Sequence, residues 1–123
     1  MAQALKILIK LETLVNHNMD LTRRYPKHLR PTLGKRLDDH WITALIIVSK
    51  IRYSQPQRRL DYIHDFNENI NTIRILIRLS KSREAISNRS YQYVNEKLDE
   101  IGRMLHGLRQ YTQQQITNNQ KRS

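Results

Sequence analysis

The pairing of arginine with histidine is the first feature of this sequence that could do chemistry. Arg59 and His64 are separated by four residues. An arginine offers a planar donor fork that stabilises negative charge on phosphate, and a histidine can transfer a proton near neutral pH, so together they could cleave RNA. Arg23 and His28 have the same spacing. A basic chain therefore produces the pattern by chance, and the spacing alone does not indicate a nuclease.

Metal chemistry in a helical protein needs a different set of residues. A di-iron bundle uses Glu-x-x-His on two helices together with two further glutamates. The sequence has no Glu-x-x-His, and the nearest approaches are Asp61-x-x-His64 and, in reversed order, His17-x-x-Asp20. It has no cysteine either, which excludes disulfides, thiolate metal sites and cysteine nucleophiles. We predict no catalytic residue, no metal ligand and no cofactor, and hence a protein that is not an enzyme.

The charge of the chain indicates a polyanion as its partner. The 123 residues include 22 Lys and Arg against 11 Asp and Glu, which gives a net charge of +11. A surplus of this size repels itself in a small domain unless a polyanion relieves it. The six tyrosines form no recognised base-stacking motif. The sequence therefore favours binding to the backbone of RNA or DNA over recognition of bases.

The basic residues concentrate in two segments. Residues 23–36 hold six of them and no acid, and are expected to form a cap of positive potential at one end of the molecule. The second group begins at residue 74 with helical spacing, so its members share one stripe, which Arg103 of a later helix could join. The predicted contacts with nucleic acid or a partner protein are Arg23, Arg24, Lys27, Arg30, Lys35, Arg36, Arg74, Arg78, Lys81, Arg83 and Arg103. The alternative is a set of solvated helix faces whose charge only aids solubility.

Hydrophobic spacing predicts four helices and no sheet. Their expected ranges are about 3–22, 32–53, 57–81 and 88–115. Thr32 and Ser87 are the expected N-caps of the second and fourth helices. Because short connections make consecutive helices antiparallel neighbours, we predict an all-α, up-down-up-down four-helix bundle over residues 1–116. Residues 117–123 are polar and are expected to form a disordered tail.

No part of the sequence predicts a membrane segment. The longest uninterrupted apolar run is Ala44–Val48, which is far too short to cross a bilayer. Lys6 and Lys10 interrupt the first apolar stretch, so no signal peptide is apparent. We therefore expect a soluble, cytoplasmic protein without a membrane partner.

Gly102 lies inside the fourth predicted helix. Glycine at such a position costs up to about 1 kcal/mol relative to alanine. We expect Gly102 either to permit the close approach of a helix or subunit, or to make room for a bulky core residue such as Trp41.

Several segments carry a more specific resemblance. They are Tyr25-Pro26-Lys27, Thr32-Leu33-Gly34-Lys35-Arg36-Leu37, Ile75-Leu76-Ile77-Arg78-Leu79, Ile86-Ser87 with Tyr91, and Glu100-Ile101-Gly102-Arg103-Met104-Leu105-His106-Gly107. Together they resemble the accessory variability determinant (Avd) proteins of diversity-generating retroelements, and the wider four-helix-bundle family that includes ribosomal intervening-sequence proteins. The resemblance extends from the first predicted helix to Arg109. It departs from the family pattern after Gly107, where Leu108 and Arg109 stand in place of a frequent tryptophan.

The Avd resemblance implies a ring-like homopentamer of bundles. It further implies association with the element's reverse transcriptase and with RNA or DNA, in support of error-prone copying of template RNA into cDNA. The intervening-sequence resemblance implies instead a structural or protein-interaction role. The Arg59–His64 spacing in turn resembles the motif of helical HEPN ribonucleases, which implies RNA cleavage. We predict the first function and keep the other two as alternatives.

Overall fold

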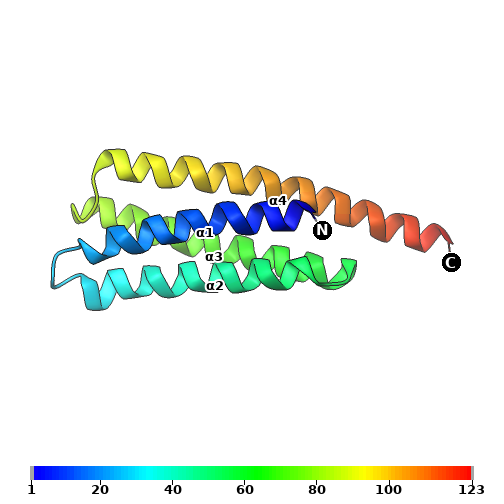
Figure 1. Cartoon of the computed structure of the whole chain (residues 1–123), viewed down its shortest axis with the longest axis horizontal. Helices are drawn as coiled ribbons and strands as arrows, with labels where there is room; N and C mark the ends of the chain where they lie inside the picture. Colours follow the sequence, from blue (N-terminus) through cyan, green and yellow to red (C-terminus); the bar gives the residue numbers. More distant parts are fainter. Residues whose placement is uncertain (1, 123) are drawn as a thin grey trace.

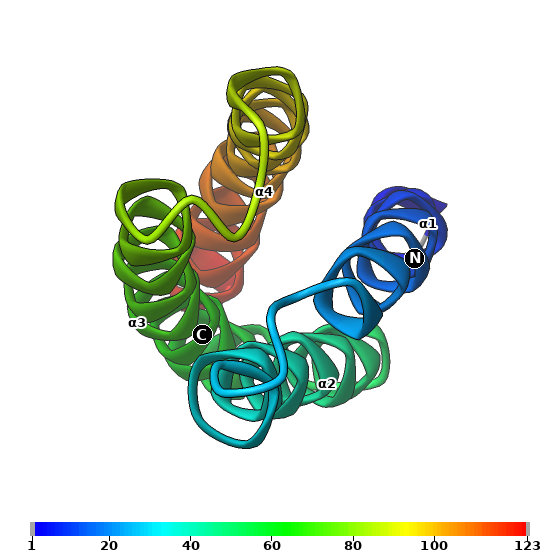
Figure 2. The same cartoon turned by 90° about the vertical axis from the view of Figure 1, so that its left-hand side faces the viewer.

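The structure, a computed structural model, describes residues 2–122, and within that range all regular structure is helical. The four long helices are α1 (Ala2–Arg23), α2 (Lys35–Arg52), α3 (Pro56–Ser82) and α4 (Asn88–Arg122). They run antiparallel in chain order (Figure 1), and each packs against its two neighbours, so that α4 returns to α1 (Figure 2). The predicted all-α four-helix bundle is confirmed. No helix of this range is long and apolar enough to span a membrane.

The core is built from one apolar stripe on each helix. Apolar residues recur three and four positions apart because that spacing returns to the same face of a helix. The stripe predicted in α3 is buried as expected, and consists of Ile63, Phe66, Ile70, Ile73 and Ile77. Trp41 of α2 is the largest fully buried side chain. Removal of these side chains from water is the main favourable term that holds the four helices together.

The start of α2 differs from the prediction. Thr32 does not cap the helix, because its hydroxyl donates to the carbonyl of Leu29 and the chain is already helical before it. One π-helical turn, η1 (Arg30–Gly34), precedes α2 and is closed by the Gly34 N–H on the Leu29 carbonyl at 2.9 Å. Pro31 explains the early start, since its fixed φ suits the first turn of a helix and its missing N–H is not needed there.

The connection from α3 to α4 agrees with the prediction. The Ser87 hydroxyl accepts the N–H of Ser90 at 3.1 Å, which is the bond that an N-cap makes to the third residue of a helix. Glu84 adopts a left-handed conformation, with φ 59°, that makes the turn tight. The end of α3 and the start of α4 therefore lie at the same end of the bundle as the connection from α1 to α2 (Figure 1, left).

At the opposite end α4 extends beyond the other three helices (Figure 1, right). Its last buried residue is Thr112, yet the helix continues to Arg122. Residues 117–122, for which the sequence predicts a disordered tail, are thus helical, and Ser123 lies outside the described residues. No glycine or proline follows Gly107, and glutamine, lysine and arginine are good helix formers. Because the overhang is polar, it adds no buried residue to the core, but its backbone is still helical.

Candidate nucleic-acid interface

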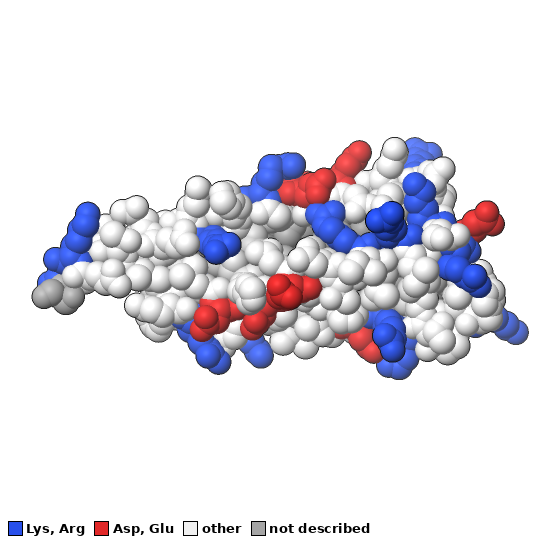
Figure 3. All heavy atoms as spheres, turned by 180° about the vertical axis from the view of Figure 1, so that it is seen from behind, with Lys and Arg blue, Asp and Glu red and all other residues white. Residues whose placement is uncertain are grey.

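The topology brings the two predicted basic segments to the same end of the bundle. Residues 23–36 connect α1 to α2, and residues 78–83 close α3 beside them. Arg36 from the first segment and Arg83 from the second line one groove. Figure 3 shows Lys and Arg gathered towards this end of the visible face, on the right, with one acidic side chain among them and the other visible acids nearer the middle. We call residues 23–36, residues 78–83 and Arg89 the basic end.

Most cations of the basic end have no partner within the chain. Arg30 Nε donates to the Tyr25 carbonyl at 2.8 Å, and Lys35 Nζ lies 2.9 Å from Asp39 Oδ2. The charged groups of six other exposed residues make no hydrogen bond or ion pair with any described residue, and these residues are Arg23, Arg24, Lys27, Arg36, Arg78 and Arg83. Unpaired cations close together raise a positive potential, which a phosphate backbone lowers.

Part of the first basic segment surrounds a shallow depression beside the end of α1. Arg23, Arg30 and Lys35 line it together with Asp38. The Asp38 carboxylate accepts the Thr22 hydroxyl at 2.7 Å, and burial raises the pKa of this carboxyl above its ordinary value. Of the three cations around it, Arg23 alone has no partner among the described residues, since Arg30 donates to the Tyr25 carbonyl and Lys35 pairs with Asp39.

Arg89 belongs to the basic end and is missed by the sequence prediction. It is exposed in the first turn of α4 and has no partner among the described residues. A cation in the first turn of a helix is unfavourable, because the helix dipole is positive there. No Lys or Arg stands next to Arg89 in the sequence. Only the antiparallel packing of α3 and α4 brings it to the other cations of the basic end.

Arg74, by contrast, is engaged in the fold. Its guanidinium donates to Asp99 Oδ1 at 2.7 Å and to Asn95 Oδ1 at 3.0 Å, which ties α3 to α4. The sequence hides this pairing, because no acid lies within one helical turn of Arg74 and its partners come from another helix. Arg74 is first of all a cross-link between two helices.

Two further residues of the predicted stripe, Arg103 and Lys81, lie beside an acid or an aromatic ring, whereas Arg78 and Arg83 are unpaired and belong to the basic end. Arg103 lines the same shallow depression as Arg74, which agrees with its predicted place beside the stripe. Asp99 lines that depression too. Lys81 lies over the ring of Tyr91, with Nζ 4.5 Å from the ring centroid. The stripe therefore carries both positive and negative side chains. The basic end is the stronger candidate for binding phosphate.

Gly102 has no neighbour in the protomer that explains it. The residue is exposed, and a Cβ atom added to it would meet no atom within 4 Å. The expectation that it makes room for Trp41 is therefore wrong, because Trp41 is buried in the core while Gly102 faces open space. The close approach of another subunit remains as the prediction for this residue.

Arg59 and His64 do not form a site together in this chain. Arg59 is only 5% exposed, and its guanidinium donates to Gln115 Oε1 at 2.7 Å and to the Ser54 carbonyl at 3.1 Å. His64 is exposed beside Glu68. Five residues of helix correspond to a rotation of about 140°, so the two side chains cannot hold one phosphate between them. Residues 2–122 also contain no group of three His, Asp or Glu side chains that could hold a metal ion.

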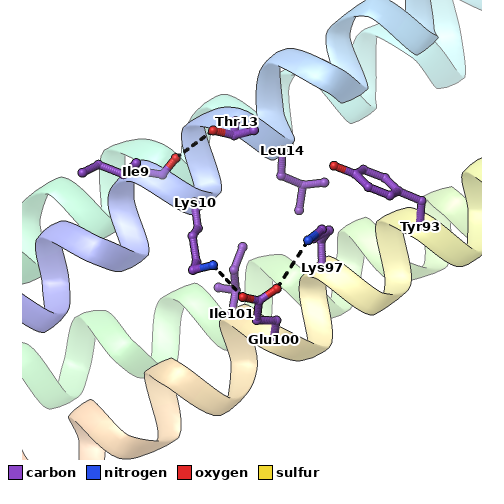
Figure 4. A pocket seen from close by; sticks show the side chains of 8 residues that line it. All are labelled: Ile9, Lys10, Thr13, Leu14, Tyr93, Lys97, Glu100 and Ile101. Atoms are coloured by element: carbon purple, nitrogen blue, oxygen red, sulfur yellow. Dashed lines mark hydrogen bonds and ion pairs between the residues drawn. The ribbon is translucent and has the colours of Figure 1, made fainter.

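A hollow between α1 and α4 is occupied by a structural ion pair (Figure 4). Lys10 Nζ lies 2.6 Å from Glu100 Oε1 across the seam, and Lys97 Nζ lies 3.6 Å from the other oxygen of the same carboxylate. The hydrogen bond from Lys10 lowers the pKa of Glu100. Since its two lysines share one carboxylate, this hollow joins the first helix to the last.

Comparison with known proteins assigns the chain to a family. The model of the bAvd-like family matches residues 5–112, which include all four helices up to the last buried residue of α4. No significant match was found among curated proteins or among solved structures. The overhang of α4 lies outside the matched range.

Proposed function

The chain belongs to the bAvd-like family, and on that premise we propose that it is the accessory protein of a diversity-generating retroelement. It binds the phosphate backbone of RNA or DNA through the basic end. It also associates with the element's reverse transcriptase, and so supports mutagenic cDNA synthesis without a catalytic step of its own. The observation that carries this proposal is the convergence of two separate basic segments, residues 23–36 and 78–83, at one end of the bundle.

The free cations set the expected strength of binding. Each phosphate neutralised on a single strand releases counterions, so the logarithm of affinity falls by about 0.7 per phosphate for each tenfold rise in salt. Four to six contacts from the basic end would give a slope of about −3 to −4. A polyanion bound only by diffuse charge would give a shallower slope and would dissociate at physiological salt.

The proposed assembly is a ring-like homopentamer. Large apolar side chains stay exposed on the isolated protomer, and exposed apolar patches mark protein interfaces. They include Leu5 and Ile9, one turn apart on α1, and Tyr93 on the adjacent α4. A ring uses the same pair of surfaces at every junction, and it would present five basic ends to one nucleic-acid strand. Such multivalency strengthens the binding of a flexible chain without any new type of contact.

Charge reversal with a matched control tests the nucleic-acid surface. The basic-end variant carries Arg23→Glu, Lys27→Glu and Arg78→Glu. The control carries Lys6→Glu, Lys121→Glu and Arg122→Glu, which change the net charge equally at positions outside the basic end. We expect the first variant to lose at least a hundredfold in affinity for single-stranded RNA and to flatten the salt slope by about 2. An equal loss in both variants would show that the charge acts diffusely.

Three further measurements test the remaining parts of the proposal. Light scattering is expected to give a mass near five protomers, and a monomer would contradict the ring. Purified reverse transcriptase is expected to co-elute with the protein. RNA incubated with the protein is expected to stay intact. Cleavage that His64→Ala abolished would replace this proposal by the ribonuclease alternative.

A further inference from the structure

An apolar groove lies within the basic end, where η1 and the start of α2 pack against the end of α3. It is lined by Leu29, Thr32, Leu33, Arg36, Leu76, Leu79 and Arg83. Leu79 is 46% exposed, and Ile75, one turn earlier on α3, is 67% exposed. Arg36 lies on α2 and Arg83 directly follows α3, and both guanidinium groups lack partners among the described residues. The groove thus combines an open apolar floor with two free arginines.

Nucleic acid alone does not account for this surface. Phosphates would pair with Arg36 and Arg83, but a phosphate backbone offers little apolar surface to cover Leu79 and Ile75. The remainder of the basic end supplies cations without such apolar neighbours, among them Arg23 and Lys27, and is the better surface for phosphate. The occupant of the groove must be apolar on one side and anionic at its edges.

We propose that the groove receives an amphipathic helix of a partner protein, with apolar side chains on one face and carboxylates beside them. A helix laid in a groove anchors residues at i, i+3 or i+4 and i+7, and these would cover Leu79 and Ile75. The planar guanidinium groups of Arg36 and Arg83 suit carboxylates, with which arginine forms paired hydrogen bonds. This inference rests on the proposed function, in which the chain holds a protein partner and nucleic acid together.

A second copy of the chain is a poorer match for the groove. It offers exposed acids beside exposed apolar residues, Glu12 near Ile9 on α1 and Asp39 near Ile42 on α2, but Asp39 is already paired with Lys35. Each copy also carries a net charge of +11, which the basic end would repel. The α4 overhang ends in Lys121 and Arg122, which would be repelled by the groove. Charge complementarity therefore favours a different protein as the occupant.

The arrangement would place protein and nucleic acid side by side. The groove lies on the α2–α3 side of the basic end, whereas the depression lined by Arg23, Arg30 and Lys35 lies on the α1–α2 side. Both belong to the same connection between α1 and α2. A partner helix in the groove would thus lie beside the strand held by the neighbouring cations.

The test compares two substitutions that leave the charge unchanged. Leu79→Asn alters the groove. Ile46→Asn is the control, because the side chain of Ile46, on the outer face of α2, is about as exposed as that of Leu79. Affinity is measured separately for the purified reverse transcriptase and for a single-stranded RNA oligonucleotide. We expect Leu79→Asn to lower affinity for the reverse transcriptase at least tenfold and to leave RNA affinity within twofold. Ile46→Asn is expected to change neither, and thermal melting confirms that both variants are folded.

Each other outcome overturns a defined part of the argument. If the wild type binds the reverse transcriptase and Leu79→Asn binds equally well, the groove assignment is wrong and the proposed function stands. If RNA affinity falls instead, nucleic acid occupies the groove. If Leu79→Asn changes the mass in light scattering, the groove is an interface between subunits. If the wild type binds RNA but no reverse transcriptase, the proposed function itself fails and the groove assignment fails with it.

Discussion

The two ends of the bundle use arginine in opposite ways. Beside the α2–α3 turn, Arg59 is buried, and its guanidinium donates hydrogen bonds to Thr112 and Gln115 of α4 and to the Ser54 carbonyl of the turn. At the basic end, the guanidinium groups of Arg23, Arg36 and Arg83 are exposed and have no partner among the described residues. The same side chain therefore stabilises the fold at one end and is left for a ligand at the other. Its place relative to the core stripe, and not its residue type, decides between these roles.

The largest effect on stability is expected at Arg59. The variant Arg59→Met keeps the apolar stem but leaves the Ser54 carbonyl and the Gln115 amide without their donor. A fully buried group left without its donor costs about 1–3 kcal/mol; these two are partly buried, and part of their cost is offset because the guanidinium no longer has to be desolvated. Burial lowers the pKa of Arg59, as this desolvation requires. We expect urea denaturation to show a loss of about 1–2 kcal/mol in the free energy of unfolding, with RNA affinity unchanged.

Arg23→Met is the control at the basic end. An exposed side chain without partners is expected to change the free energy of unfolding by less than about 0.5 kcal/mol, while RNA affinity falls. Equal losses of stability at Arg59 and Arg23 would contradict the difference between the two ends.

The sequence predicted the parts of the molecule that follow from local periodicity. The α3 stripe from Ile63 to Ile77 is buried because spacings of three and four fix one helix face, whatever packs against it. It also located the basic segments. It could not predict the partners of Arg74 or the groove around Leu79, because those depend on which residues of different helices come together. The prediction that Thr32 caps α2 was wrong for a local reason, because the helical turn that contains Pro31 begins before Thr32.

Gly102 is expected to show the next largest effect. Since a Cβ atom at this position meets no atom of the protomer, Gly102→Ala should raise the free energy of unfolding of the protomer by about 0.5–1 kcal/mol. Gly107→Ala is the matched control, because Gly107 is exposed on the same helix with equally open space around it. If another subunit approaches Gly102, only Gly102→Ala will also lower the mass measured by light scattering. A loss of stability in Gly102→Ala at monomer concentration would contradict the open position.

The pair of Arg74 and Asp99 is expected to contribute less. A double-mutant cycle with Arg74→Gln and Asp99→Asn should give a coupling energy of about 0.2–1 kcal/mol, since both side chains are partly exposed. RNA affinity separates this arginine from the basic end. Arg78→Gln removes a free cation and should weaken RNA binding more than Arg74→Gln does. The reverse order would place the phosphate surface on the α3–α4 stripe and remove the distinction drawn between paired and free arginines.

The smallest effect is expected from removal of the α4 overhang. Deletion of residues 117–123 takes away helix that lies beyond the last buried residue, Thr112, and it spares Gln115, which Arg59 needs. Because no core contact is lost, the free energy of unfolding should change by less than about 0.5 kcal/mol. The deletion also removes Lys121 and Arg122, yet RNA affinity should stay within twofold if the basic end holds the strand. A tenfold loss would instead place a nucleic-acid contact at the far end of the bundle. Both ends would then bind nucleic acid, and the contrast between a structural end and a binding end would be wrong.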